Sequence, residues 1–563
     1  MSGSPLSGNA PLTVSFDGTT TDPDGTVAAY RYDFDDGGTA FTEDAVHTFT
    51  EPGTYFVNFT VADNGGKMNT DIIAITVNDP TTPPDYPSIG YHPYAYPLAA
   101  STESVAPGME RPLPSSRRHI LQWADQLYRL TAAQEAFATR NLIGTQKIAQ
   151  RDIEGLRDRN PDFFVLQYHL AYGLTRVGDW TDKNSYGPER DKFDAWMAAK
   201  GYGATERTNL IIRSSVSTYA SNSDSPDWDT DYGQPGLFDG ALRCSAYFYF
   251  TNLWYDPGAG RLWARYIAEE TGRRMQMNDA GYDCDGTFFD TSSHPGSNLV
   301  NCSGTWFTGV SGVHANLYAA DLAAFTPIWN GLARTYYSFV RSSYSSGHRW
   351  LVLPNANKMV DSTYYPDYLR DTDGAWIEHF CVNGDATLVT AGPGEWEVSF
   401  GRICQYITGP KKILCALPAF DHSAANADAT RSFIIASFLL VKNDTSYISH
   451  NAGGYGSPPG SAALRWYPEY EIGAYLDDCP SAIADLRVAG TSNLYARWYS
   501  GGVVLVNTSS SVTYPFTLDR TYYPYQFTDG SKPAQSIATG GAVSGSVNVP
   551  PNTGMVLRVT PYP

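Results

Sequence analysis

The sequence predicts a multidomain protein that combines an N-terminal β-sandwich, a (β/α)8 barrel and a C-terminal antiparallel β-sandwich. Three patterns along the 563 residues support this fold class. Apolar and polar residues alternate with a period of two near the start, short apolar runs then alternate with helix-compatible segments, and helical periodicity stops near residue 471. The length also exceeds that of one ordinary domain. We place the domains at 1–79, 115–470 and 471–563, with a linker and lead-in at 80–114.

The first predicted domain is a small β-sandwich. Its strand-like runs are PLTVSFDG, YRYDFDDGG, GTYFVNFTVADNGG and DIIAITVND, and turn residues separate them. The stretch DPDGTVAAYRYDFDDG…HTFTEPGTYFVNFTVADNGG resembles the PKD (polycystic kidney disease) domain. The resemblance implies an accessory module of an exported microbial protein, with a spacer or adhesive role. Its acidic residues either bind calcium or form turns; they are Asp22, Asp24, Asp33, Asp35 and Asp36.

A proline-rich stretch, NDPTTPPDYP at 78–87, predicts a semi-rigid linker. The segment SSRRHILQWADQLYRLTAAQEAFATR at 115–140 has an amphipathic pattern and a serine cap signal. These two features predict a helix at the entrance to the second domain.

Eight β-like runs in the second domain alternate with helix-compatible segments, which is the pattern of a (β/α)8 barrel. An open doubly wound sheet is the alternative, and it is disfavoured because no glycine-rich phosphate loop follows the first strand. The runs are NLIGTQK (141–147), PDFFVLQYHLAYG (161–173), TNLIIRSS (208–215), GTFFDTSS (286–293), HRWLVLPNAN (348–357), GAWIEHF (374–380), KKILCALPAF (411–420) and SFIIASFLLV…SYISHN (432–451).

The last predicted domain consists of strands and turns. NLYARWYSGGVVLVNTSSSVTYPFTL, YQFTDG and VNVPPNTGMVLRVTPYP lack helical periodicity. A terminal β-domain beside a barrel is common among carbohydrate-active enzymes, although fold analogy alone does not give function.

Composition restricts the partners. The chain has 58 acidic and 39 basic residues, a formal charge of −19, and such a chain repels the phosphates of nucleic acids. No apolar run is long enough to span a bilayer. Because the PKD resemblance implies a module of an exported protein, we expect an extracellular or cell-surface location. The first residues contain no signal peptide, and we expect an export signal upstream of them. None of the seven cysteines forms a CxxC pair, which disfavours zinc ribbons and thioredoxin-like chemistry and leaves one to three disulfides open.

The aromatic content is high, at 14% with 39 Tyr and 13 Trp. Two interpretations stay open at this point. The aromatic residues belong either to a tyrosine-rich β-protein surface or to a cleft where flat rings stack on sugars.

Two hexapeptides follow one template, DGTFFD at 285–290 and DGAWIE at 373–378. Each ends a predicted strand with an acid, Asp290 on the fourth strand and Glu378 on the sixth. The carboxyl ends of barrel strands carry the active site. Alternatively, a strand-end Asp caps the next segment, and a single Glu is a solvated rim residue.

Side-chain alternation predicts the neighbours of these acids. An inward Asp290 places Phe288 inside the barrel and Phe289 against the helices, and an inward Glu378 places Trp376 inside. Glycoside cleavage needs an acid to protonate the leaving oxygen, and a carboxylate to attack the anomeric carbon or to activate water. We therefore predict that Asp290 and Glu378 are a catalytic pair.

Polar and aromatic side chains near the other strand ends complete the predicted site, because such groups bind sugar hydroxyls. The loop SPDWDTDYGQPG at 225–236 is a calcium loop, a substrate-binding flap or a solvated loop. The insertion at 291–320 is long enough to shape a cleft. The predicted substrate-binding residues are Tyr168, His169, Arg213, Trp228, Asp229, His294, Trp306, Asn355, Asn357, Trp376, His379, His450 and Asn451.

The order of several motifs over about 140–560 resembles known glycosyl hydrolases. GYDCDGTFFD, PDFFVLQYHLAYG, DGAWIEHF, RWYPEYEIG and GGVVLVNTSSS…VPPNTGMVLRV together are similar to hypothetical glycosyl hydrolase family 15 and, more distantly, to the family 114 endo-polygalactosaminidases. The resemblance implies a catalytic Asp at DGxFxD, which is Asp290, and a second acid at DGxxxE, which is Glu378. The DGxDxDxE pattern of family 18 is absent, which disfavours a substrate-assisted chitinase.

An acid on strand four with a partner on strand six also resembles the retaining α-glycosidases of the family 31 and 36 type. That resemblance implies that Asp290 is the nucleophile and Glu378 the acid/base. Exchanged roles and an inverting mechanism stay open.

The sequence thus predicts an extracellular glycoside hydrolase that acts on a poly- or oligosaccharide, with no catalytic metal and no required cofactor. Structural calcium and the oligomeric state stay open. The first alternative is a noncatalytic surface, matrix or glycan-binding protein on a degenerate barrel. The second is a polysaccharide lyase with His169 as base and Arg213 against a uronate, which the paired acids disfavour.

Overall fold

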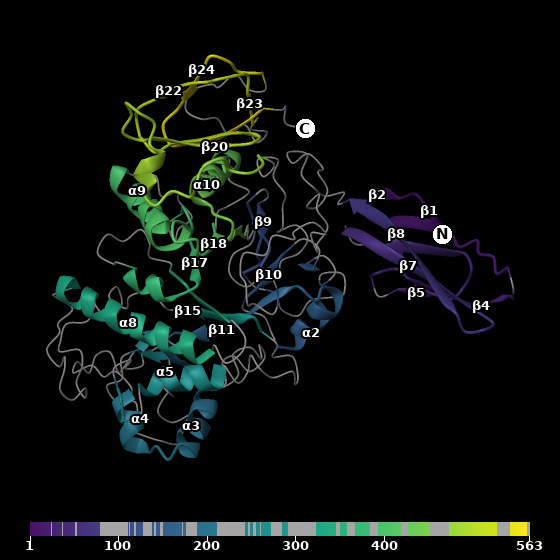
Figure 1. The fold of residues 1–563 in the computed structure, drawn as a ribbon, viewed down its shortest axis with the longest axis horizontal. Helices are drawn as coiled ribbons and strands as arrows, with labels where there is room; N and C mark the ends of the chain where they lie inside the picture. The colour runs from purple at the N-terminus through teal and green to yellow at the C-terminus, as the bar shows by residue number, and fades with distance from the viewer. Residues whose placement is uncertain are drawn as a thin grey trace.

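The computed structural model describes most of the chain and is shown in Figure 1. The purple N-terminal strands lie to one side of the body, and the yellow-green C-terminal strands lie beyond helices α9 and α10. Apart from short interruptions in the first, second, fourth and fifth ranges, the described residues are 1–78, 111–175, 189–210, 243–250, 255–271, 284–290, 322–344, 350–356, 366–382, 392–418, 426–449, 472–525 and 541–559.

The N-terminal domain is a β-sandwich, as predicted. One sheet has the order β1-β3-β6 and the other the order β2-β8-β7-β4-β5. Alternating residues of both sheets, among them Val14, Tyr32 and Val57, are fully buried between them. The strands are β1 (Ser2–Ser4), β2 (Ser7–Asn9), β3 (Leu12–Asp17), β4 (Val27–Asp33), β5 (Thr39–Ala40), β6 (Ala45–Phe49), β7 (Gly53–Asp63) and β8 (Met68–Asn78).

Eight strands of the body pair in parallel, and their pairings return to the starting strand. β10, β11, β15 and β16 form one run, and β17, β18, β19 and β9 form another. Single parallel bridges join the runs, from Ala124 to Thr145 and from Asn355 to Trp376. The strands are β9 (Leu121–Gln122), β10 (Gly144–Thr145), β11 (Phe164–Leu170), β15 (Gly286–Asp290), β16 (Leu351–Pro354), β17 (Gly374–Glu378), β18 (Ile413–Leu417) and β19 (Ser446–Ile448).

Side chains of these strands divide between two buried clusters. Phe288 and Trp376 belong to a cluster made almost entirely of residues from the eight strands, which we call the interior cluster. Phe289 belongs to the larger outer cluster and packs edge-on against Tyr336 and Tyr337 of the following helix. The alternation predicted for the two hexapeptides is therefore confirmed at Phe288, Phe289 and Trp376.

Helices and a small side sheet separate the eight strands along the chain. The side sheet, in the order β12-β14-β13, lies in sequence between β11 and β15. These elements are α2 (Gln150–Arg159), β12 (Gly173–Thr175), α3 (Glu189–Ala199), α4 (Ala204–Leu210), β13 (Arg243–Ser245), β14 (Phe248–Phe250), α5 (Leu262–Tyr266), η3 (Ile267–Thr271), α8 (Leu322–Tyr344), η4 (Asp367–Asp371), α9 (Gly392–Ile403), η5 (Cys404–Thr408) and α10 (Ala427–Val441).

Three predicted elements of the body differ from the structure. The segment 115–140, predicted as a helix, contains strand β9 near its start. Residues 208–210 of the strand predicted at 208–215 lie in helix α4, and residues 211–215 lie outside the described residues. The apolar run at 432–441 lies in helix α10, whereas the continuation of that predicted run contains β19. An apolar run that is buried on all sides has no periodicity that separates helix from strand. β9 is an additional strand before Asp290, and among the described parallel strands Asp290 ends the fourth and Glu378 the sixth.

The C-terminal domain contains two antiparallel sheets, β20-β21-β25-β23 and β22-β24. Residues of both sheets, among them Leu505 and Val547, share one buried cluster. The domain packs closely on α10, because a Cβ on Gly554 would lie 2.6 Å from Cα of Phe433. Its elements are η8 (Ile483–Leu486), β20 (Leu494–Tyr499), β21 (Gly502–Asn507), β22 (Tyr514–Thr517), β23 (Tyr523–Pro524), β24 (Ser546–Val549) and β25 (Thr553–Arg558).

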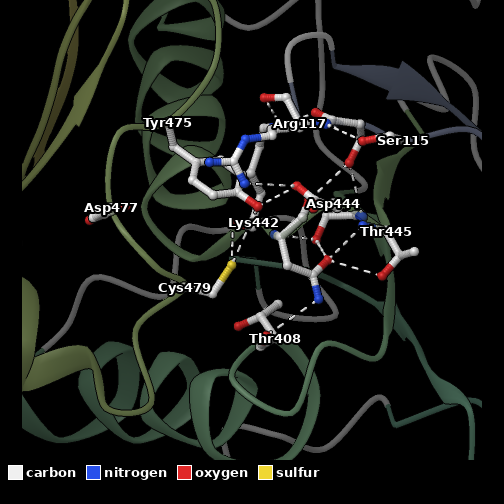
Figure 2. A network of polar contacts seen from close by, with 12 residues as sticks. Ser115, Arg117, Thr408, Lys442, Asp444, Thr445, Tyr475, Asp477 and Cys479 are labelled. Atoms are coloured by element: carbon white, nitrogen blue, oxygen red, sulfur yellow. Dashed lines mark hydrogen bonds and ion pairs between the residues drawn. The ribbon is translucent and has the colours of Figure 1, made fainter. Parts of the chain in front are cut away.

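A buried polar network joins this domain to the end of α10 (Figure 2). Nη1 of Arg497 donates to the carbonyl oxygens of Leu439, Leu440 and Lys442, which satisfies acceptors that the helix leaves open at its C-terminus. The Arg497 guanidinium also lies over the ring of Tyr475, 4.3 Å from its centroid. The C-terminal domain thus completes the end of a helix of the body.

Among the described residues, none of the helices combines the length and the apolar character needed to cross a membrane. Of the cysteines, Cys381, Cys404, Cys415 and Cys479 are free thiols.

Candidate functional site

Each of the two template segments carries an acid at both ends of its strand. At the amino end of β15, Oδ2 of Asp285 accepts the backbone N–H of Val165 at 2.7 Å. Arg157 and Arg111 lie 2.8 and 3.1 Å from the same carboxylate, which is almost completely buried. Asp285 therefore ties β15 to β11 and to α2, and its role is structural.

The second template repeats this arrangement. Oδ2 of Asp373 accepts the backbone N–H of Val352 at 2.9 Å, and Arg341 of α8 lies 2.8 Å from the carboxylate. The glycine that follows permits a close approach of the next strand, because a Cβ on Gly374 would lie 2.0 Å from the carbonyl oxygen of Ile413. The Asp and Gly that begin each hexapeptide therefore hold neighbouring strands together. Only the final acid of each hexapeptide lies at the carboxyl end of its strand.

Asp290 stands at that opposite end, and neighbouring strands hold both of its carboxylate oxygens. The hydroxyl of Tyr168 on β11 donates to Oδ2 at 2.7 Å. Nδ2 of Asn355, directly after β16, donates to Oδ1 at 3.0 Å. Asp290 itself is partly exposed. The predicted residues Tyr168, Asn355 and Asp290 therefore lie together, with an acceptor carboxylate between two neutral donors.

Glu378 ends β17, two positions after Trp376, and is 6% exposed. Trp376 is fully buried in the interior cluster and touches Phe288 at 6.0 Å between ring centroids. Trp376 therefore lies inside the ring of strands, as the alternation predicts, and its contact with substrate stays a prediction. The next residue, His379, has a φ of 57°, and burial lowers the pKa of its imidazole.

His169 lies on the other face of β11. It is buried, and its ring lies 6.3 Å from those of Trp263 and Phe289 in the outer layer. Alternation along a strand allows only one of two consecutive residues to face the interior. The prediction that both Tyr168 and His169 line the site is therefore wrong for His169.

The sequence analysis missed a third acid at the same end of the strands. Asp125 follows β9, and its Oδ1 accepts a hydrogen bond of 2.8 Å from Nε2 of Gln146, which follows β10. Oε1 of Gln146 accepts the indole N–H of Trp123 at 2.7 Å. All three side chains are buried. Asp125 was missed because it lies within the helix predicted for 115–140. The available signal was the pattern Trp-x-acid, which occurs at Trp123–Asp125 and again at Trp376–Glu378.

We call Asp125, Gln146, Tyr168, Asp290, Asn355 and Glu378 the carboxyl-end site. The substrate-binding roles of Trp376 and His379 stay predictions. Eight further predicted site residues lie outside the described residues, and their roles stay predictions too. They are Arg213, Trp228, Asp229, His294, Trp306, Asn357, His450 and Asn451.

The acids of the N-terminal domain that are described form local contacts. Oδ1 of Asp33 accepts the N–H of Asp35, and Asp36 accepts the N–H of Gly38 and contacts His47. These contacts are those of turn-forming acids. Asp24 lies outside the described residues, and calcium binding near Asp22 stays a prediction. Within the described ranges, no group of three or more His, Cys, Asp or Glu side chains is placed to hold a metal ion.

Residues 3–77 match the family described as PKD domain. The N-terminal sandwich is a PKD domain. Over 65 residues the chain is 42% identical to Collagenase ColA of Clostridium perfringens (strain 13 / Type A), a match that covers 11% of this chain and 6% of the collagenase. The chain therefore spans only a small part of that relative's length.

Two solved structures illustrate the similarities in space. The PKD1 domain of Vibrio cholerae metalloprotease PrtV is 33% identical, and the match covers 12% of this chain and 82% of that domain, with a TM-score of 0.12. A family 39 glycoside hydrolase from Bacteroides cellulosilyticus WH2 is 10% identical, and the match covers 99% of each chain, with a TM-score of 0.30.

Proposed function

We propose that this protein is an extracellular glycoside hydrolase that cleaves a poly- or oligosaccharide with Asp290 and Glu378. One observation carries the proposal. Both oxygens of Asp290 accept hydrogen bonds, from Tyr168 at 2.7 Å and from Asn355 at 3.0 Å, and so the carboxylate is held in a defined orientation. A carboxylate oriented in advance loses little freedom when it attacks a bound sugar. The PKD domain supports an extracellular location.

We also propose that the body is a (β/α)8 barrel. The circular pairing of eight parallel strands supports this architecture. In such a barrel the carboxyl ends of the strands form the catalytic face. Asp290 and Glu378 both end their strands at that face.

The proposed reaction is a retaining double displacement. An Asp290 oxygen attacks the anomeric carbon, while Glu378 gives its proton to the glycosidic oxygen as the bond from that oxygen to the anomeric carbon breaks. Water then attacks the glycosyl–Asp290 ester at the anomeric carbon, Glu378 takes the proton of that water, and Asp290 leaves as a carboxylate. Both proton transfers run through Glu378, so the reaction requires no cofactor.

The test compares Asp290→Asn and Glu378→Gln with the wild type on pullulan, galactan, xyloglucan and chitosan. We expect release of reducing ends to fall by about 10²–10⁴-fold in either variant, with an unchanged melting temperature. Asp162→Asn is the matched control, because Asp162 is exposed at the amino end of β11. A double variant that keeps full activity would contradict the proposal.

The configuration of the first product, followed by proton NMR, tests the mechanism separately. Retention supports Asp290 as nucleophile, whereas inversion assigns Asp290 to the activation of water. Glycan binding without turnover in the wild type would favour a noncatalytic role. The lyase alternative is disfavoured, because its base His169 packs against Trp263 and Phe289 rather than beside Asp290.

A further inference from the structure

We propose that Asp125 is a third functional carboxylate of the carboxyl-end site, where it binds hydroxyl groups of the sugar on which Asp290 and Glu378 act. This inference rests on the proposed function. It assigns Asp125 to substrate binding and Gln146 to its positioning. Neither residue stands out in the sequence as a member of a catalytic pair.

The first observation is a repeated Trp-x-acid pattern, Trp123-Ala-Asp125 and Trp376-Ile-Glu378. The two tryptophans come from β9 and β17, which are three steps apart in the circular order of strands. Their fully buried rings meet at 6.5 Å between centroids in the interior cluster. A residue two positions further along a strand points to the same face. Asp125 and Glu378 therefore both lie on the side of this tryptophan contact that faces the carboxyl ends of the strands.

The second observation is the support of Asp125. Trp123 Nε1 can only donate, so Oε1 of Gln146 is its acceptor, and this contact leaves Nε2 of Gln146 to donate to Asp125. Gln146 thus holds one carboxylate oxygen of Asp125 in a defined orientation, and its own orientation is fixed by the buried indole of Trp123.

The third observation points to the ligand. Nε1 of Trp376 is buried, and within the described part of the chain it has no hydrogen-bond partner. A buried N–H without an acceptor is unfavourable, so a group that accepts from it is expected to bind nearby. Hydroxyl groups both donate and accept. A sugar ring could therefore donate to Asp125 and accept from Trp376 at the same site.

The test measures binding separately from turnover. Affinity electrophoresis with pullulan, galactan, xyloglucan and chitosan is run on the Asp290→Asn variant and on the same variant that also carries Asp125→Asn. We expect the second change to weaken retention by about 10–100-fold, the effect of a hydrogen bond to a charged group. Asp162→Asn in the Asp290→Asn background is the control, and its retention should not change.

Kinetic measurements on single variants distinguish substrate binding by Asp125 from a purely structural role. We expect Asp125→Asn to raise KM by about tenfold or more, with a melting temperature equal to that of the wild type. Gln146→Leu, which removes the positioning donor, should raise KM less. If Asp125→Asn leaves retention and KM unchanged, the inference is wrong while the assignment of Asp290 and Glu378 stands. If no polysaccharide retards the Asp290→Asn variant, the inference is also wrong. Turnover by Asp290→Asn at the wild-type rate would instead contradict the proposed function.

Discussion

The hydroxyl of Tyr168 donates a hydrogen bond of 2.7 Å to Oδ2 of Asp290 across two neighbouring strands. The Tyr168 ring also packs on Phe288, with 5.9 Å between centroids. Replacement by Phe removes the hydroxyl and keeps this packing. We expect Tyr168→Phe to lower kcat by about 10–100-fold, since a hydrogen bond to a charged group contributes about 1.5–3 kcal/mol.

Reducing-end release and a thermal melt together check this prediction. KM and the melting temperature of Tyr168→Phe should stay near the wild-type values. Tyr514→Phe, on β22 of the C-terminal domain, is the matched control and should change neither quantity. A wild-type kcat in Tyr168→Phe would mean that the hydroxyl does not support Asp290 in the reaction.

Asp285 and Asp290, at the two ends of β15, should respond in opposite ways to the same substitution. Asp285→Asn removes the buried negative charge that Arg157 and Arg111 contact. We expect it to lower the free energy of unfolding by about 3–5 kcal/mol, whereas Asp290→Asn lowers activity instead. Urea denaturation measures the first effect, and equal stability of Asp285→Asn and wild type would contradict the structural role.

Gly374 should tolerate no side chain. A Cβ there would lie 2.0 Å from the carbonyl oxygen of Ile413, so Gly374→Ala must push β17 away from β18. We expect a loss of about 1–3 kcal/mol in the free energy of unfolding. Gly331, inside α8, has no heavy atom within 4 Å of such a Cβ. Gly331→Ala should therefore stabilise the protein by about 0.5–1 kcal/mol, and denaturation curves that do not separate the two variants would contradict this account.

The sequence predicted the faces of the longer strands because alternation alone determines them. An inward Phe288 and an outward Phe289 follow from one assumption about Asp290, and the two buried clusters separate them as expected. The PKD domain was equally clear, because its strands alternate over long runs. What a strand pattern cannot give is register. The contact between Tyr168 and Asp290 depends on how β11 is paired with β15.

The site residue that was missed shows a second limit. β9 has only two residues, and the stretch around it also fits a helix. Asp125 therefore falls within a predicted helix rather than at a predicted strand end. Helix α10 led to the reverse error, because it is apolar on nearly all sides and has no helical stripe that distinguishes it from a strand.

The junction in Figure 2 buries a lysine. Nζ of Lys442 donates to the carbonyl oxygens of Ser116 and Arg117, and this contact ties the segment before β9 to the end of α10. Lys442 is 1% exposed, and burial lowers the pKa of its ammonium from 10.5 to about 7. The cost of keeping this charge in the folded protein therefore depends on pH.

Lys442 should make the protein more stable as pH rises from 7 to 9. Its folded pKa of about 7 lies below the unfolded value, so the unfolded chain binds more protons over this interval, and the free energy of unfolding increases with pH. Relative to Lys442→Met, the wild type should gain about 2 kcal/mol between pH 7 and 9, whereas Lys411→Met, at an exposed position, should parallel the wild type. Other titrating groups cancel in the difference between two proteins that share them. Urea denaturation at several pH values gives this difference, and parallel curves for wild type and Lys442→Met would contradict a depressed pKa at Lys442.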